Sequence, residues 1–155
     1  MITLIREGLK EDLPKVLELI SELADYEKAL EEVTITLDDL ENDGFGKTSY
    51  YSFLVAEQNE TIIGLSFYFI RYSTWKGKFL YLEDFIIKEE YRNRGIGSLL
   101  FEATIDVCKK QDLNGMIWQV LDWNTPAIKF YKKYNASIST DWYNGKLTKD
   151  QISNL

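Results

Sequence analysis

The chain has 155 residues, of which 45% are apolar and 28% charged. This composition is typical of one folded domain and excludes a disordered, collagen-like or mucin-like chain. Histidine is absent, which excludes Ser-His-Asp and Cys-His catalysis and any histidine-ligated metal. Cys108 is the one cysteine, so neither an intramolecular disulfide nor a cysteine-rich zinc site can form. The net charge of −7 argues against nucleic-acid binding and favours a cationic partner, although acidic chains are also ordinary among soluble proteins.

No segment has the length and apolarity of a signal-peptide core or a membrane span. We therefore expect a cytoplasmic protein with no membrane contact. No repeat and no Gly/Ser-rich or Pro-rich linker interrupts the chain, which predicts a single domain over residues 1–155.

Hydrophobic spacing and turn residues predict the elements in chain order. They are a strand at 3–6, a helix at 11–27, a short helix from Thr36 to about Gly44, strands at 51–57, 61–71 and 78–88, a helix at 98–111, a strand at 115–121, a helix from Thr125-Pro126 to about 133, and strand material at 136–147 around Asn144-Gly145. The three consecutive strands form an antiparallel meander. The helix that follows makes the third strand and the one at 115–121 parallel neighbours. The predicted fold class is α/β (α+β), with helices packed on a mixed, mostly antiparallel sheet.

The sharpest motif is the octet Tyr-Arg-Asn-Arg-Gly-Ile-Gly-Ser at 91–98, between a predicted strand and a predicted helix. Its two glycines allow the backbone to approach a ligand closely. The helix that follows directs free N–H groups to the same place, and Arg92 and Arg94 add positive charge. These features predict a phosphate cradle, which is neither a Walker loop nor a dinucleotide fingerprint. An ordinary glycine turn with surface arginines is the alternative interpretation.

A second motif, Asn-Thr-Pro-Ala-Ile-Lys-Phe-Tyr, occupies residues 124–131. Asn124 and Tyr131 are two helical turns apart and share one stripe with Ala127 between them. A small residue between an amide and a phenol suits a groove along which a ligand lies. An ordinary amphipathic helix with a half-buried tyrosine is the alternative.

Together, Arg-x-x-Gly-x-Gly on a strand-to-helix loop and Asn-x-x-Ala-x-x-x-Tyr after the next strand resemble the GNAT superfamily of acetyl-CoA-dependent N-acetyltransferases. The order of predicted elements matches that fold over essentially the whole chain. Tyr-Ser-Thr-Trp-Lys-Gly at 72–77, Leu-Tyr-Leu-Glu-Asp-Phe at 80–85 and Leu-Asp-Trp-Asn at 121–124 are similar to the diamine acetyltransferase branch. The first and last of these look closer to thialysine than to spermidine/spermine acetyltransferases. The resemblance implies a parallel strand pair that splays into a V-shaped slot.

The resemblance also implies the site. Acetyl-CoA would bind as co-substrate, with no metal ion, and Tyr131 would be the general acid that protonates the leaving thiolate. A phenol of ordinary pKa about 10 can donate to a thiolate of pKa about 8.5. The residues implied to contact acetyl-CoA are Phe85, Ile86 and Ile87 along the pantetheine arm, Arg92, Asn93, Arg94, Gly95, Ile96, Gly97 and Ser98 around the pyrophosphate, and Asn124, Ala127 and Tyr131.

A base is needed as well, because a primary amine with a pKa of about 10 is protonated at neutral pH and cannot attack. Glu83 and Asp84 lie beside the expected acetyl position, and adjacent strand residues face opposite sides unless a bulge intervenes. The resemblance favours Glu83, acting directly or through water, with Asp84 or bulk water as alternatives. The residues expected to bind the acceptor amine are Tyr26, Glu27, Trp75, Glu83, Asp84, Gln119 and Trp142.

Two positions depart from the family pattern. Asn135 stands where a glycine commonly closes the helix, and asparagine tolerates the left-handed conformation that such a cap needs. Ser73 stands where the spermidine branch has an acid, which favours a thialysine-like amino acid over a long polyamine. Diamines, polyamines and other lysine-like acceptors stay open.

Two other functions remain as alternatives. One is a catalytically silent acyl-CoA-binding module of the same fold, against which the intact Tyr131 argues. The other is a peptide or protein N-acetyltransferase, against which the acidic segment 27–43 argues, because it is expected to close over a small substrate. By resemblance the chain is expected to form a homodimer, with Trp142 and Tyr143 in an aromatic-rich closing segment.

Overall fold

The computed structural model describes residues 2–155. It contains two compact units, one ending at Gln119 and the other running from Val120 to Leu155. No helix within residues 2–155 is long and apolar enough to cross a membrane.

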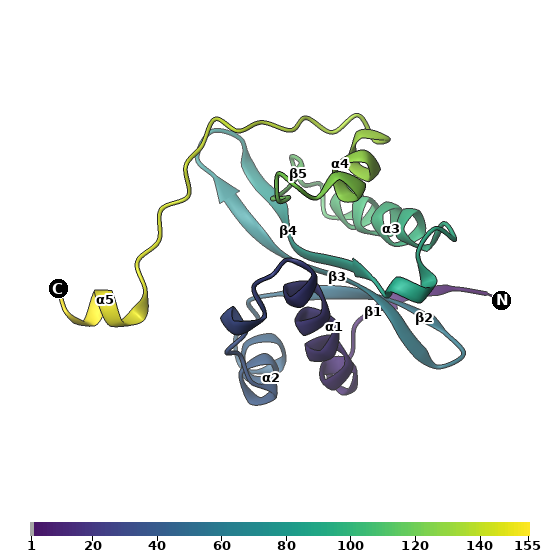
Figure 1. Cartoon of the computed structure of the whole chain (residues 1–155), viewed down its shortest axis with the longest axis horizontal. Coiled ribbons are helices and arrows are strands. Elements are labelled where there is room, and N and C mark those ends of the chain that lie inside the picture. The colour runs from purple at the N-terminus through teal and green to yellow at the C-terminus, as the bar shows by residue number, and fades with distance from the viewer. Residues whose placement is uncertain (1) are drawn as a thin grey trace. The chain divides into compact units, whose positions relative to one another are not determined.

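The first unit is built on one five-stranded sheet with the strand order β1-β2-β3-β4-β5 (Figure 1). Its strands are β1 (Leu4–Glu7), β2 (Ser52–Gln58), β3 (Thr61–Ser73), β4 (Gly77–Ile87) and β5 (Met116–Trp118). The first four pair antiparallel, and β4 and β5 pair parallel. This confirms the predicted mixed, mostly antiparallel sheet.

Helices cover both faces of this sheet (Figure 1). On one face lie α1 (Leu13–Tyr26) and α2 (Leu37–Phe45), and on the other lies α3 (Ile96–Lys110). Three short 3-10 helices, η1 (Lys10–Asp12), η2 (Leu30–Glu32) and η3 (Glu89–Tyr91), lie in the connections. The predicted start of α2 is confirmed, because the side chains of Thr36 and Asp39 cap each other's backbone N–H groups.

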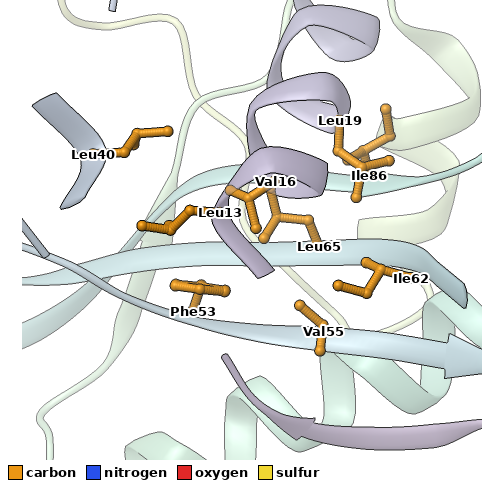
Figure 2. Packing of buried hydrophobic residues seen from close by; sticks show 9 residues of the cluster. All are labelled: Leu13, Val16, Leu19, Leu40, Phe53, Val55, Ile62, Leu65 and Ile86. Carbon is orange, nitrogen blue, oxygen red and sulfur yellow. The ribbon is translucent and has the colours of Figure 1, made fainter. Parts of the chain in front are cut away.

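The core beneath α1 follows from helical spacing (Figure 2). Leu13, Val16 and Leu19 recur every three residues and are fully buried, as a helix with one apolar stripe requires. Burying each of these side chains contributes about 1.5–3 kcal/mol. They pack with Leu40 of α2 and with residues of β2, β3 and β4, namely Phe53, Val55, Ile62, Leu65 and Ile86.

On the opposite face, α3 packs against β3, β4 and β5. The Phe101 ring meets Phe85 and Trp118 edge to face, each at a centroid distance of 5.7 Å. Ser66 and Thr104 are buried polar residues whose hydroxyls bond each other at 2.7 Å, and the Thr104 hydroxyl also donates to the carbonyl of Leu100. This packing fixes the strand that leads into the glycine loop.

Arg6 on β1 fixes the entry of the chain into α1. Its guanidinium donates two hydrogen bonds to the carboxylate of Asp12 and one to that of Glu57 on β2. The hydrogen bond from Arg6 is the main reason that the pKa of Asp12 is lowered. Asp12 also accepts the Leu9 N–H, so the turn before α1 is held to the sheet.

In the second unit the helices are α4 (Thr125–Lys132) and α5 (Lys149–Ser153). The predicted strand material at 136–147 is wrong, because this segment has no regular secondary structure. A hairpin dipeptide such as Asn144-Gly145 specifies a turn only where the flanking segments can pair. The side chains of Trp142 and Tyr143 are exposed, so this segment lacks the buried face that would set a strand register.

Both ends of α3 also differ from the prediction. α3 starts at Ile96, so Gly97 and Ser98 lie in its first turn and not before it. α3 ends at Lys110, one residue before the predicted end at 111, where Asp112 takes the left-handed conformation and Leu113 donates to the Cys108 carbonyl at 3.0 Å.

Candidate functional site

A β-bulge lies in the middle of β4. Phe67 of β3 pairs with Asp84, but the next β3 residue, Tyr68, pairs with Leu82, so Glu83 has no opposite partner. The extra residue breaks the alternation of side chains between the two faces. A bulge that allows Glu83 and Asp84 to face the same side of the sheet is therefore present at Glu83.

Cross-strand and ring contacts show which way the residues around the bulge face. Phe85 contacts Phe101 of α3. Tyr68, directly opposite Leu82, lies near enough to Cys108 of α3 for the thiol to influence its pKa. Leu82 and Phe85 thus both face α3, and Glu83 and Asp84 fall together on the α1 side.

Asp84 lies on the same face as Ile86, which belongs to the core beneath α1. Burial, followed by the negative charges of Glu83 and Glu27, raises the pKa of Asp84 to about 7. Burial also raises the pKa of Glu27, just beyond the end of α1. Glu83 is exposed. Three of the residues expected to bind the acceptor amine, Glu27, Glu83 and Asp84, therefore lie close together.

Among residues 2–155, no strand pairs with the edge of β4 beyond the bulge on the β5 side. β5 pairs with β4 only from Leu80 to Leu82, and β5 ends at Trp118 while β4 continues to Ile87. This part of the β4 edge is therefore not covered by β5, and the Ile87 carbonyl there accepts the Nε–H of Arg92 at 2.9 Å. This arrangement fits a pantetheine arm lying along Phe85, Ile86 and Ile87.

The glycine loop turns sharply into α3. Asn93 and Gly95 both have left-handed backbone, at φ values of 60° and 78°. A Cβ built on Gly95 would meet no atom within 4 Å, so this side of the loop is open. The first helical bond runs from the Leu99 N–H to the Gly95 carbonyl, and the preceding amides of Ile96, Gly97 and Ser98 have no acceptor in the helix. These amides suit an anionic ligand such as a pyrophosphate.

The two arginines of the loop are held differently. Arg94 lies over the ring of Tyr91 in its own loop, with the guanidinium carbon 5.5 Å from the ring centroid. Arg92 lies over Tyr26 at the end of α1, at 5.4 Å. Sequence reasoning missed the contribution of Tyr91, although an aromatic residue three positions before an arginine in a tight loop is a usable signal.

Trp75 is not brought to the carboxylates by the fold of the first unit, whereas Gln119 directly follows Trp118, which pairs with Leu82 beside Glu83. Trp75 is exposed at the turn between β3 and β4, and Asp84 lies seven positions beyond Gly77 along β4, which corresponds to roughly 23 Å. Ser73 accepts the N–H groups of Trp75 and Lys76, each at 3.2 Å, so it serves this turn. Gln119 is exposed and follows β5 directly.

In the second unit, Asn124 is the N-cap of α4 and its side-chain oxygen accepts the Ala127 N–H at 3.4 Å. The cap is therefore Asn124 and not Thr125, which is the first helical residue. Tyr131 is buried and lies two turns further along the same helix. Its ring meets that of Phe130 edge to face at 5.5 Å. Trp142 is 79% exposed.

Within residues 2–155, no group of three or more Cys, Asp or Glu side chains is arranged to hold a metal ion. The carboxylates around β4 therefore have no geometry that singles out a metal centre. Their chemistry suits hydrogen bonding to, and proton exchange with, a cationic ligand.

The sheet, the helix-starting glycine loop and the open edge of β4 together define an acyltransferase fold. Residues 13–136 match the acetyltransferase (GNAT) family. The chain belongs to this family and is an enzyme of the acyltransferase class, whose members use acetyl-CoA as co-substrate.

Individual acetyltransferases are similar to the chain over most of its length. The chain is 40% identical to the thialysine N-epsilon-acetyltransferase of Bos taurus over 146 residues, which cover 89% of this chain and 86% of that protein. It is 30% identical to the spermidine/spermine N(1)-acetyltransferase-like protein 1 of Homo sapiens, over 97% of this chain and 23% of that protein. An aminoglycoside acetyltransferase from an uncultured soil metagenomic sample has the same fold, with a TM-score of 0.79, 17% identity, and coverage of 94% of this chain and 97% of that one.

The raised pKa of Asp84 predicts a pH-dependent stability. Its ordinary value of 3.8 rises to about 7 in the fold, so the protonated carboxyl is favoured by folding and this advantage is lost as pH rises through about 7. We expect Asp84→Asn to gain on the order of 2 kcal/mol of unfolding free energy relative to wild type between about pH 5 and pH 8. Urea unfolding at both pH values measures this, with Glu83→Gln as a charge-matched control that gains much less. Equal stability differences at both pH values would contradict the buried-acid interpretation.

Proposed function

We propose that the enzyme transfers the acetyl group of acetyl-CoA to the primary amine of a small cationic acceptor. A lysine-like amino acid such as thialysine is favoured over a long polyamine. The observation that carries this proposal is the juxtaposition of Glu27, Glu83 and Asp84 beside the unpaired edge of β4. Three neighbouring carboxyl groups attract an ammonium ion, and the β4 edge suits the arm that carries the acetyl group.

The proposed cofactor site is positively charged, whereas the proposed acceptor site is negatively charged. The amides of Ile96, Gly97 and Ser98 at the start of α3, with Arg92 and Arg94 nearby, match the charge of a pyrophosphate. Acetyl-CoA supplies an electrophilic thioester carbonyl and a thiolate leaving group. The protein groups have to deliver a neutral amine to that carbonyl and return a proton to the departing sulfur.

Proton transfer is proposed to use a carboxylate that accepts a proton from the amine and a phenol that donates a proton to the sulfur. Glu83, directly or through water, accepts a proton from the bound ammonium, and the freed lone pair attacks the acetyl carbon. The alternative acceptor is Asp84, whose pKa of about 7 is well matched to a proton exchange near neutral pH. The C–S bond then breaks, the phenol of Tyr131 gives its proton to the sulfur, and the second proton lost by the attacking nitrogen passes through solvent to restore the phenol. The products are the acetylated amine and the free thiol.

The preference for a lysine-like acceptor rests on two observations. Relatives named as thialysine N-epsilon-acetyltransferases cover most of the chain at up to 40% identity. In addition, Ser73 is engaged by the turn between β3 and β4 and supplies no negative charge to a second ammonium group.

A screen of amines for acetyl-CoA-dependent thiol release tests the reaction class. Thialysine and other lysine-like amines are expected to give a higher kcat/KM than spermidine. Tyr131→Phe should lower kcat by about 10²–10⁴, the usual contribution of general acid catalysis, and should leave CoA affinity nearly unchanged because the ring remains. Thiol release from no amine would favour a silent acyl-CoA-binding module. Release only with peptides would favour a peptide acetyltransferase, and full activity of Tyr131→Phe would remove this residue from the mechanism.

The pH dependence separates the two candidate bases. If Glu83 is the base, Glu83→Gln should lower kcat/KM by about 10² near pH 7 and by less near pH 9, where more of the amine is already neutral. If Asp84 is the base, activity should rise with pH through about 7 in wild type, and Asp84→Asn should abolish this rise. Equal losses at both pH values in both variants would mean that the carboxylates only bind the cation and that water is the base.

We also propose that the enzyme is a homodimer. The segment after α4 exposes Trp142 and Tyr143, which are 79% and 102% accessible, and a second copy is the proposed partner for these aromatic side chains. Light scattering at micromolar concentration is expected to give twice the mass of the chain, and Trp142→Ser with Tyr143→Ser should shift the mass toward one chain. A single-chain mass for the wild type would contradict this proposal.

A further inference from the structure

Arg92 joins two parts of the first unit that are far apart in sequence. Its Nε donates a hydrogen bond of 2.9 Å to the carbonyl of Ile87, the last residue of β4. Its guanidinium carbon lies 5.4 Å from the ring centroid of Tyr26, the last residue of α1. The first contact fixes the direction of the side chain, and the second places the guanidinium over an aromatic face, where a cation is attracted.

A second contact connects the same face of α1 to the same end of β4. Lys88 follows β4, and its Nζ lies 3.5 Å from a carboxylate oxygen of Glu22. Glu22 and Tyr26 are four residues apart, so they are neighbours on one side of α1. Arg94, by contrast, stacks on Tyr91 within the loop and makes no comparable contact with α1 among the described contacts.

The end of α1 is locally rigid, so a displacement of Tyr26 also displaces Glu27. The Glu27 N–H donates to Leu23, the left-handed Lys28 donates to Asp25, and the Ala29 N–H closes the turn on the Ala24 carbonyl at 2.8 Å. Glu27 in turn contributes to the raised pKa of Asp84, which places the end of α1 beside the bulge in β4.

From these contacts we infer that Arg92 is a positioning residue that couples the glycine loop to the acceptor side through Tyr26. This inference rests on the proposed function, because it takes the loop as the CoA site and Glu27 as part of the acceptor site. The terminal nitrogens of Arg92 are the atoms left to reach an anionic ligand, while its Nε and one guanidinium face hold the strand end and Tyr26. An anion bound at the loop therefore orders the end of α1.

Such coupling is reciprocal in binding free energy. A cofactor that stabilises the stacked arrangement of Arg92 and Tyr26 also favours the position of Glu27 that receives an ammonium ion. The loop thus influences acceptor binding through Arg92 and Tyr26, in addition to its own contact with the cofactor.

Hydrogen–deuterium exchange with CoA as the probe tests the coupling without any knowledge of the acceptor. In wild type, saturating CoA is expected to slow exchange in the loop 92–98 and, by about fivefold, at the amides of Glu27, Lys28 and Ala29. Tyr26→Leu removes the aromatic face and should retain the loop protection but lose the CoA-dependent protection of α1. Tyr26→Phe keeps the face and should behave as wild type.

Arg92→Lys and Arg94→Lys form a matched pair, since both retain the charge and both remove a guanidinium stacked on a tyrosine. Both are expected to weaken CoA binding, so exchange is measured at saturation for each. Only Arg92→Lys should lose the protection of α1. A general loss of stability would instead raise exchange at the end of α1 with and without CoA, and would leave the CoA-dependent ratio unchanged.

The outcomes are separable. CoA binding that protects only the loop in wild type would overturn the inference and leave the proposed function intact. Protection of α1 that survives in Tyr26→Leu, or that is lost equally in Arg94→Lys, would likewise overturn it. Failure of wild type to bind CoA at all would remove the proposed cofactor site, and the inference would fall with it.

Discussion

In an uninterrupted strand Leu82 and Phe85 would face opposite sides of the sheet, yet both face α3, and the extra residue between them makes this possible. The bulge therefore lets β4 serve two purposes. It keeps the apolar side chains of Leu82 and Phe85 on the α3 side, and it presents two adjacent carboxyl groups to the opposite side. Without the bulge, only one of Glu83 and Asp84 could lie near the end of α1.

The short pairing of β5 complements this arrangement. Three parallel pairs hold β5 to the first half of β4, and the second half is left without a partner on that edge. An exposed edge is ordinarily a liability for a sheet because its backbone groups invite other chains. Here the unpaired segment leads directly through η3 into the glycine loop and α3. In the proposed function, the same continuous segment therefore lies along an extended arm and offers amides to an anionic end group.

Local patterns were sufficient to predict α1 to α4, the meander and the turn into α3, because their periodicity or turn residues act within a few positions, whereas α5 was not predicted. The strand at 136–147 was predicted wrongly, since Asn144-Gly145 indicates a turn but not whether a partner strand exists. The bulge could not be located, because Leu82-Glu-Asp-Phe85 fits either register until the packing on α3 is known. The pairing of Arg92 with Tyr26 was also beyond reach, because it depends on tertiary contact across 66 positions.

The burial of Asp84 lowers the free energy of unfolding where this carboxyl ionises, and the same carboxyl belongs to the proposed acceptor site. Burial beside the apolar core, followed by the negative charges of Glu83 and Glu27, disfavours the charged form of Asp84. Substitution of Asp84 by a neutral residue removes this repulsion, so the acid is not explained by folding alone. An ammonium ion bound among the three groups would reverse the sign of the interaction, because it stabilises the ionised form of Asp84 that burial and the neighbouring acids disfavour. The repulsion in the free enzyme and the attraction for a cation thus have the same electrostatic origin. In the proposed reaction, one of these carboxyl groups, or a water molecule held by them, takes the proton from the bound ammonium so that a neutral amine meets the acetyl group.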